Sequence, residues 1–341
     1  MWHLNYPAPD DLKKYKQRLL NPLKDSIRSA TNLGIRNTLL PINSNGTEDD
    51  SSLIGLLTFK PQELYRLNND LISSLINGYN DTEFEAYLIA KGKQDCDQEP
   101  LYIKYHDMLE SLLNIFNYEK KISKNKSRSY MIARMKGRDS CTYCNRQYTQ
   151  TIVRDGGTND DNRIARPQLD HWFSQELFPL MSLSFFNLIP SCSICNSTAK
   201  GNAIFRFHTH IHPYFRAKSN PDFYFNYKAG FNGEWEIEIE NDADVQEQNM
   251  VDAFHLREVY KYHSKLELKD ILDFSLGNND TYLDTLLNQT LIKFPHKTKE
   301  DIYCMFFGTK LHEEDFLDRP MSKFKYDILK KVGVIDKLRN R

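Results

Sequence analysis

Apolar residues recur at helical spacing over three stretches of the N-terminal third of the chain. These stretches are residues 11–23, 61–92 and 99–118, and the last contains LYIKYHDMLESLLNIF. Residues 24–60 instead mix Ser, Asn, Gly and Asp, as in NSNGTEDDSS, a composition typical of a loop or poorly ordered segment. We therefore predict an N-terminal helical region over residues 1–130, with a flexible segment at 24–60.

The pattern is different in the C-terminal third. Residues 222–242 alternate apolar and polar side chains around FNGE, which predicts a β-hairpin with an Asn-Gly turn. Helical spacing returns from about Val245, most clearly in MVDAFHLREVYKYHSKLELKDILDFSL and MSKFKYDILKKVGVIDKL. We predict a hairpin followed by a helical domain over residues 216–341. The whole chain is predicted to be an α+β protein, mainly helical.

Composition and charge limit the classes of function. Hydrophobic residues make up 40% of the chain and aromatic residues 12%, enough for real cores. The formal net charge is −1, so any nucleic-acid binding must come from local patches. One such candidate is the basic run from Glu119 to Arg138, which a solvated helix face explains as well as a phosphate contact does. No signal peptide or membrane span is evident, so we expect a cytoplasmic protein without a membrane partner.

Two C-x2-C pairs predict a metal site. Cys141 and Cys144 lie in SCTYCN, and Cys192 and Cys195 lie in SCSICN. Each pair places two thiolates on one side of a tight turn, and two such turns complete a tetrahedral zinc shell. In a cytosolic chain this pattern favours metal over disulfides, although two redox C-x-x-C motifs are the alternative. We predict a structural Zn2+ bound by all four cysteines.

The 47 residues between the pairs contain further polar residues that can support hydrolysis. Phosphodiester cleavage needs a base that activates water and a cation that stabilises the developing charge. At a strand end, Asp170 can hold a metal while His171 faces the water. Asn196, opening a predicted helix, would supply a second oxygen ligand. Lys200, four residues later on the same helix face, could meet a phosphate.

Each of these residues also has an ordinary structural interpretation. An isolated Asp-His pair is typical of a hydrogen-bonded surface turn, and an Asn after C-x2-C is typical of a helix cap. Their order between two zinc half-sites favours a zinc-supported nuclease. The alternative is a structural zinc module that binds nucleic acid.

The motif LDHW…NLIPSCSICNSTAKGN resembles the HNH endonucleases, nucleases in which two strands and a helix surround one divalent cation. CTYCNRQY resembles the first half of the zinc site in the four-cysteine branch of that family. The resemblance is specific over about residues 138–215, and it implies a central zinc-braced ββα-metal module over residues 131–215.

The same resemblance implies a role for each motif residue. Asp170 and Asn196 would hold Mg2+ or Mn2+, since an Asn at the third motif position favours these hard cations. His171 would be the general base. Asn187 would brace the loop between the two strands and orient that base.

A softer similarity extends over about residues 130–341. FRFHTHIHPYF, FHLREVYKYHSKL and LHEEDFLDRPMSKFKYDIL resemble a bacterial subgroup of HNH proteins. This subgroup includes the small nuclease partner of an ATPase in anti-phage systems of the Septu type, some linked to retrons. The resemblance implies a nuclease effector, with DNA favoured as substrate, that acts with an SMC- or ABC-like ATPase. The alternatives are a non-catalytic zinc subunit that binds nucleic acid or the ATPase, and a toxin-like HNH RNase acting on tRNA.

Four other residues carry weaker predictions. Arg166, just upstream of the motif in ARPQLDHW, is a candidate phosphate contact, and Arg146 is a lesser one. Cys96 and Cys304 have no partner at ligand spacing and are expected to be ordinary thiols.

Histidines and aromatic residues near the motif have two interpretations. His208, His210 and His212 alternate in FHTHIHPYF, so in a strand they would share one face and could bind metal. A polar strand near the site is the favoured interpretation, with His212 the first candidate if any of them is functional. The following aromatic residues are predicted to form core rather than to stack on bases: Tyr143, Trp172, Phe185, Phe186 and Tyr214.

Overall fold

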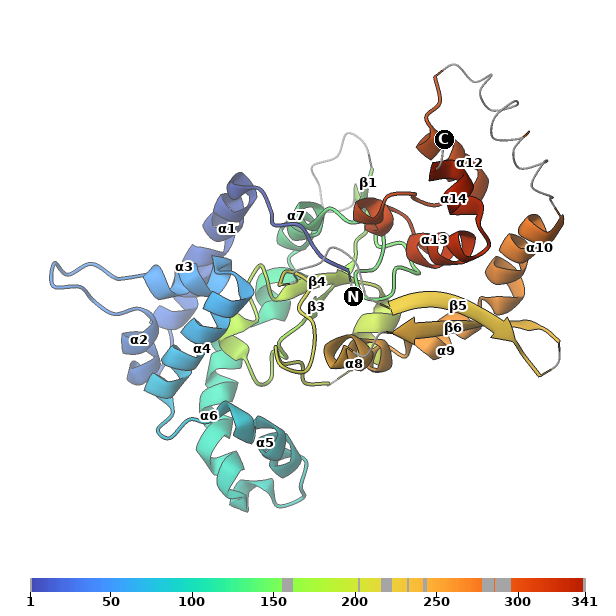
Figure 1. Cartoon of the computed structure of the whole chain (residues 1–341). Coiled ribbons are helices and arrows are strands. Elements are labelled where there is room, and N and C mark those ends of the chain that lie inside the picture. The colour runs from blue at the N-terminus through green and yellow to red at the C-terminus, as the bar shows by residue number, and fades with distance from the viewer. Residues whose placement is uncertain are drawn as a thin grey trace.

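The computed structural model describes residues 2–154, 162–201, 203–215, 223–231, 233–241, 244–277, 285 and 296–339. Over these residues the chain is mostly helical with small two-stranded sheets, which confirms the α+β class (Figure 1). In these ranges no helix has the length and apolar character needed to cross a membrane. The Gly- and Asn-rich stretch GGTNDDN, whose composition is typical of a loop, lies almost wholly outside the described residues.

Helices dominate the N-terminal third of the chain. They are α1 Pro9–Arg28, α2 Leu33–Leu39, α3 Ser51–Thr58, α4 Pro61–Leu75, α5 Phe84–Lys91, α6 Pro100–Ile115 and α7 Lys126–Lys136. Short 3-10 or π turns separate some of them: η1 Asp81–Glu83, η2 Cys96–Gln98 and η3 Glu119–Ser123. Asn125 caps α7 by accepting a hydrogen bond from the Arg128 amide, and Gly137 ends it at a φ of 56°.

The prediction of a loop over residues 24–60 is wrong for most of that segment. Helix α1 continues to Arg28, and α2 and α3 occupy much of the remainder. Tertiary burial explains the difference, because the segment places seven apolar residues in the core: Ile27, Ile35, Leu39, Leu40, Leu53, Leu56 and Leu57. The Ser, Asn and Gly residues that suggested a loop are concentrated between α2 and α3.

The helix predicted over residues 61–92 is divided in the structure. Helix α4 ends at Leu75, and η1 precedes α5. Gly78, with a φ of 64°, lies in the interruption, where a residue without Cβ adopts the left-handed conformation at little cost. The prediction over residues 99–118 is confirmed by α6.

The central region contains two strand pairs and a short helix. Its elements are β1 Ile152–Val153, β2 Arg163–Ala165, β3 Gln168–His171, η5 Pro179–Met181, β4 Leu188–Ser191 and η6 Ile194–Ala199. Strands β3 and β4 are antiparallel, with Asp170 opposite Ile189 and His171 opposite Leu188. Helix η6 follows β4 at once, so the order in this region is strand, strand, helix.

The C-terminal third begins with the predicted hairpin. Strands β5 Phe223–Ala229 and β6 Trp235–Asn241 pair antiparallel, which confirms the hairpin, although Asn232 of the predicted turn lies outside the described residues. The helices that follow are α8 Val245–Ala253, α9 Leu256–Lys261, α10 Lys269–Gly277, α12 Lys299–Phe307, α13 Ser322–Lys331 and α14 Val334–Arg339. The π turn η7 Ser264–Leu268 and the 3-10 turn η10 Glu313–Asp318 lie between them.

One hydrophobic core includes buried residues from all three regions predicted from the sequence. Hydrogen bonds also join the regions. The Tyr15 hydroxyl donates to the Leu183 carbonyl at 2.6 Å, and the Ser140 amide donates to the Leu317 carbonyl at 2.9 Å. The central region is therefore held from both sides by the helical regions.

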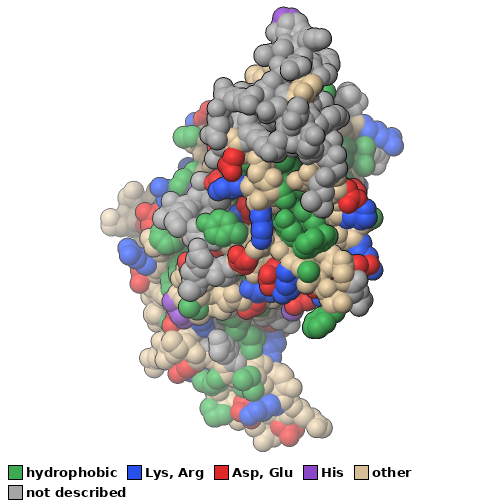
Figure 2. Space-filling model, turned by 45° about the vertical axis from the view of Figure 1, so that its right-hand side comes forward, with side chains coloured by type: hydrophobic (Ala, Val, Ile, Leu, Met, Phe, Trp, Pro, Cys, Tyr) green, Lys and Arg blue, Asp and Glu red, His purple; other side chains and the backbone are tan. Residues whose placement is uncertain are grey.

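Surface charge is mixed on the face shown in Figure 2, which brings the C-terminal side of the molecule forward. Among the described residues of this face, basic and acidic side chains are interspersed. This agrees with the near-neutral net charge of the chain.

Candidate functional site

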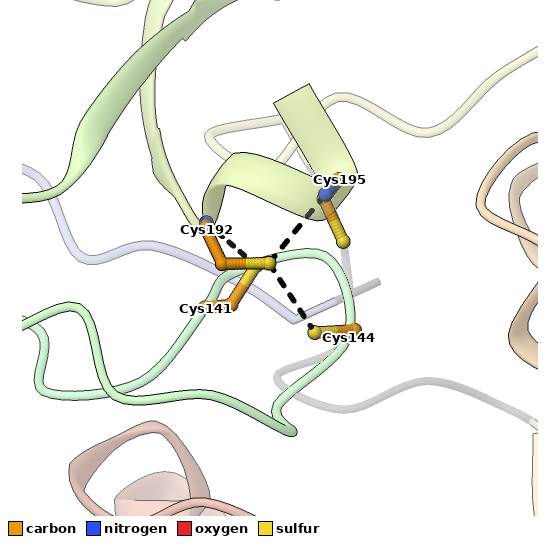
Figure 3. Close-up of side chains that lie close together, drawn as sticks. All are labelled: Cys141, Cys144, Cys192 and Cys195. Carbon is orange, nitrogen blue, oxygen red and sulfur yellow. Dashed lines mark hydrogen bonds between the residues drawn. The ribbon is translucent and has the colours of Figure 1, made fainter. Parts of the chain in front are cut away.

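The four cysteines of the two C-x2-C pairs converge in the structure (Figure 3). Cys141 and Cys144 come from the loop that follows α7, while Cys192 and Cys195 come from the end of β4 and the first turn of η6. Their sulfur atoms all lie within 4.8 Å of one another, and all four side chains are buried. Within the described ranges, no other group of three or more Cys, His, Asp or Glu side chains converges in this way.

The geometry of this cluster fits a structural metal ion such as zinc. A tetrahedral site with Zn–S bonds of about 2.3 Å places its sulfurs about 3.8 Å apart, and the Cys144 and Cys192 sulfurs are 4.0 Å apart. All six cysteines of the chain are free thiols, and no disulfide joins any of the four sulfurs of the cluster. Hydrogen bonds from the other three thiols hold the pKa of Cys192 well below its usual range, whereas burial raises the pKa of Cys141, so a bound cation is needed to keep all four groups as thiolates.

Asn145, the residue after Cys144, joins the zinc knuckle to the C-terminal region. It adopts a left-handed conformation with a φ of 50°, which Asn tolerates better than most residues. Its side-chain amide donates hydrogen bonds to Ser140 Oγ at 2.8 Å, the Phe316 carbonyl at 2.7 Å and the Arg319 carbonyl at 3.0 Å. Nothing in the spacing of the motif pointed to this role, because its partners are 171 and 174 residues away.

Asp170 lies on β3 with its side chain buried. The Tyr143 hydroxyl donates to Asp170 Oδ2 at 2.5 Å. The Lys200 ammonium donates to both carboxylate oxygens, at 3.0 and 3.1 Å, and also to the His171 carbonyl. Tyr143 is core, as predicted, and its ring stacks on Phe254 with centroids 4.2 Å apart, but its hydroxyl is a contact to the site that sequence analysis missed.

His171 is the last residue of β3, at the strand end predicted from the sequence. Its Nε2 lies 2.9 Å from the Ser182 carbonyl oxygen. A carbonyl only accepts hydrogen bonds, so Nε2 carries the proton and Nδ1 keeps its lone pair. The Tyr118 ring packs edge-on against the imidazole at 4.5 Å. Burial lowers the pKa of His171 to about 4, so the imidazole is neutral at ordinary pH.

Asn187 braces the loop between β3 and β4. It is fully buried, its Oδ1 accepts from the Phe173 amide at 2.7 Å, and its Nδ2 donates to the carbonyls of Phe173 and Met181 at 3.1 and 3.0 Å. Met181 precedes Ser182, whose carbonyl holds the His171 ring. Asn187 therefore holds the loop whose Ser182 carbonyl contacts His171, and its part in orienting a catalytic base stays a prediction.

Asp170, His171 and Asn196 line one cavity of about 250 Å3, together with Lys200. Asn196 lies in η6, and its Nδ2 donates to Gln168 Oε1 at 2.7 Å. This bond directs the amide nitrogen toward β3 and leaves Oδ1 as an acceptor. A carboxylate and an amide oxygen are the hard donors that Mg2+ and Mn2+ prefer, so the donor set fits such a cation.

The role predicted for Lys200 is corrected by the structure. Its side chain does lie on the β3-facing side of η6, as the four-residue spacing indicated. However, its Nζ is buried against Asp170, where it neutralises the carboxylate, rather than presented to a phosphate. A buried ammonium requires such a partner, because an unpaired charge in the interior costs several kcal/mol.

The two arginine candidates lie outside the cavity. The Arg166 guanidinium donates to the carbonyls of Pro167 at 2.9 Å and Ser123 at 3.4 Å, so it is held between β3 and the end of η3. Arg146 is partly buried beside the zinc knuckle. A phosphate contact by either residue stays a prediction.

The histidines of FHTHIHPYF do not form a strand, and the expectation that they share one face is wrong. The segment turns, which leaves His208 exposed and His212 buried at 1% exposure. His210 stacks on Phe205 at 4.2 Å, and His212 packs on Trp172 at 4.5 Å. The aromatic residues predicted as core are buried, which confirms that prediction.

The structure thus brings four of the sequence-predicted residues into one cavity: Asp170, His171, Asn196 and Lys200. Asn187 and the four cysteines do not line this cavity and hold the elements around it. Among the residues that sequence analysis missed are Tyr143 on Asp170 and the Ser182 carbonyl on His171. Comparisons with protein-family models, with curated proteins and with solved structures find no match to this chain.

Proposed function

We propose that this chain is a metal-dependent endonuclease of the HNH type, which hydrolyses phosphodiester bonds of nucleic acid, with DNA favoured. The observation that carries the proposal is the shared cavity. Asp170 and His171 at the end of β3 face Asn196 of η6 across it, in the order strand, strand, helix. Motif residues that are distant in the sequence thus line one cavity, and this proximity supports the proposal.

His171 is the base in this proposal. Its Nε2 is committed to the Ser182 carbonyl, so Nδ1 is the atom that takes a proton from water. With a pKa of about 4, the ring is neutral and able to accept a proton at every pH above about 5. The hydrogen bonds of Asn187 stabilise the loop that contains Ser182, whose carbonyl accepts from Nε2. Asn187 is therefore a positioning residue.

Asp170 and Asn196 are the residues that would hold the divalent cation. When bound, Mg2+ or Mn2+ would stabilise the negative charge that develops on the phosphate and on the leaving oxygen. The Tyr143 hydroxyl and the Lys200 ammonium orient the Asp170 carboxylate. Lys200 must share the carboxylate when the cation binds.

The zinc site is structural in this account. Four thiolates fill a tetrahedral shell and leave no open position for water. Cys192 and Cys195 bracket the start of η6, so a metal bound by these thiolates would fix the helix that carries Asn196.

A cleavage assay tests the proposal. We expect the purified, zinc-loaded chain to cleave DNA when Mg2+ is added, and His171→Ala to abolish cleavage while zinc content and circular dichroism stay as in the wild type. His208→Ala is the matched control, because His208 is exposed and lies outside the cavity. Cleavage of RNA, including tRNA, but not DNA would favour the toxin-like alternative, and undiminished cleavage by His171→Ala would refute the assignment of the base.

The proposed partner follows from the sequence resemblance alone. We propose that the nuclease serves anti-phage defence together with an SMC- or ABC-like ATPase. Co-purification with the products of neighbouring genes, followed by the same assay on the complex, tests this role. A non-catalytic zinc subunit would co-purify with its ATPase but give a complex whose activity does not depend on His171.

A further inference from the structure

A groove of about 510 Å3 lies between α1, α7 and the β1–β2 pair, in a part of the molecule that the catalytic proposal does not use. Helices α1 and α7 lie near each other, with β1 close to α7 (Figure 1). Three cationic side chains line the groove: Lys14 from α1, Arg134 from α7 and Arg163 from β2. One carboxylate, that of Asp11, lines it as well. Among the described residues, the lining of the groove therefore carries net positive charge.

The apolar part of the groove lies between these charges. Tyr130, Met131 and Met135 of α7 line it, and the Tyr130 ring centroid is 5.8 Å from the Arg163 guanidinium carbon. Cationic groups beside an aromatic and thioether surface match a polymer in which phosphates alternate with apolar sugar faces.

Helix α7 lies in a strongly basic segment of the chain. Residues 119–138 contain eight basic residues and one acidic residue, within a chain whose net charge is −1. Lys14 and Arg134 are exposed, and neither forms an ion pair with any residue that the structure describes.

The groove and the catalytic cavity are also lined by residues that are close in the sequence. Strand β2, which carries Arg163, leads through Arg166 directly into β3. Asp170 is the seventh residue after Arg163, and an extended chain of that length spans at most about 25 Å. This is less than one turn of duplex DNA, whose half-sites lie about 34 Å apart.

We propose that this groove binds the sugar-phosphate backbone of duplex DNA within one helical turn of the bond that is cut. The proposal rests on the proposed function, because it names the substrate of that same site and the surface that holds it. Lys14, Arg134 and Arg163 contact phosphates, and the apolar side chains of α7 pack against the sugars. These contacts position the duplex without reading its sequence.

Binding measured without catalysis tests the groove. The probe is a fluorescently labelled DNA duplex of about two helical turns, titrated with the full zinc-loaded chain in buffer without added Mg2+ or Mn2+. The variants are Arg134→Glu and, from the opposite wall, Lys14→Gln. The matched control is Arg36→Glu, which makes the same charge change at an exposed residue of α2 outside the groove.

We expect Arg134→Glu to weaken binding roughly tenfold or more at 0.1 M salt, and to reduce the slope of log K against log salt by about one. Lys14→Gln lowers that slope by a similar amount, and Arg36→Glu leaves it unchanged. An unchanged slope for Arg134→Glu and Lys14→Gln, or an equal loss for Arg36→Glu, overturns the proposal. Binding of an RNA duplex in preference to DNA overturns the assignment of the ligand.

These outcomes are separate from those of the nuclease proposal. If His171→Ala abolishes cleavage but DNA binding does not depend on Arg134, only the groove is wrong. If DNA binding depends on Arg134 but cleavage does not depend on His171, only the catalytic assignment is wrong.

Discussion

Asp170 and Lys200 form a buried ion pair, with Nζ and Oδ2 3.0 Å apart and side chains that are 6% and 3% exposed. The pair joins β3 to the residue that follows η6, the two elements that carry the candidate catalytic groups. Burial of either charge without the other costs several kcal/mol, so the pair helps to hold the cavity in shape. It also places a protein cation on the carboxylate proposed to bind a metal.

Lys200→Met should therefore destabilise the fold and make it responsive to Mg2+. The variant leaves the Asp170 carboxylate buried without its counter-ion, so we expect the free energy of unfolding to fall by about 3–5 kcal/mol. Added Mg2+ should recover about 2–3 kcal/mol of this lost stability when its concentration is far above its dissociation constant. Urea denaturation with and without Mg2+ measures both effects.

A second buried ion pair supplies the control. Lys323 and Asp327 lie 3.1 Å apart within α13 and are as buried as the first pair. Lys323→Met should lose a comparable amount of stability but gain nothing from Mg2+. An equal response of the two variants to Mg2+, or no response of Lys200→Met, would contradict the assignment of Asp170 as a cation ligand.

Removal of a zinc ligand should unfold the central region. We expect one zinc per chain by atomic emission, and Cys192→Ser to lose it. Structural zinc sites bind with roughly 10–16 kcal/mol, more than the whole stability of a typical domain, so this variant should lack cooperative thermal unfolding. Cys96→Ser, outside the cluster, should keep both the zinc and the transition. Full zinc content in Cys192→Ser would show that the four thiols are not the ligand set.

Substitution of Asn145 separates backbone strain from hydrogen bonding. Asn145→Gly loses the three bonds to Ser140, Phe316 and Arg319, and should lower the free energy of unfolding by about 2–4 kcal/mol. Asn145→Ala loses the same bonds but keeps a Cβ at a φ of 50°, so it should be about 1–2 kcal/mol less stable than Asn145→Gly. Equal stability of the two variants by urea denaturation would mean that the left-handed conformation is not kept.

Lys136 should give the protein a stability that rises with pH. Its Nζ is buried against the Phe185 carbonyl at 2.6 Å and the Tyr214 hydroxyl at 2.9 Å, and burial holds the Lys136 pKa well below its usual range. Between that lowered pKa and about 10.4, the unfolded chain binds a proton that the folded chain does not. The free energy of unfolding therefore rises with pH, by at most about 1.4 kcal/mol per unit.

The comparison with Lys136→Met isolates this contribution. The difference in unfolding free energy between the wild type and the variant should change in favour of the wild type from about pH 8 to about pH 10. Lys13→Met, which removes an exposed ammonium of α1, reports the change in net charge alone. Parallel pH profiles for the wild type and Lys136→Met would show that Lys136 is protonated in both states.

The sequence predicted those features that depend on neighbours in the chain. The two C-x2-C turns, the strand end at His171 and the hairpin after residue 222 all depend on local spacing, and the structure agrees with each. The contacts that complete the site are long-range: Lys200 reaches Asp170 across 30 residues, and Asn145 reaches Arg319 across 174. The spacing of apolar and polar residues along the chain carries no information about such long-range contacts. The helices within residues 24–60 were missed for the same reason, because burial against distant segments overrides their loop-like composition.

The central claim is that His171 is the base of a metal-dependent nuclease, and chemical rescue tests it most directly. DNA cleavage in the presence of Mg2+ should be measured for the wild type and His171→Gly, each with and without added imidazole. We predict that His171→Gly is inactive and folded, and that imidazole restores cleavage in this variant without changing the wild-type rate. Cleavage by His171→Gly at the wild-type rate without imidazole would contradict the account.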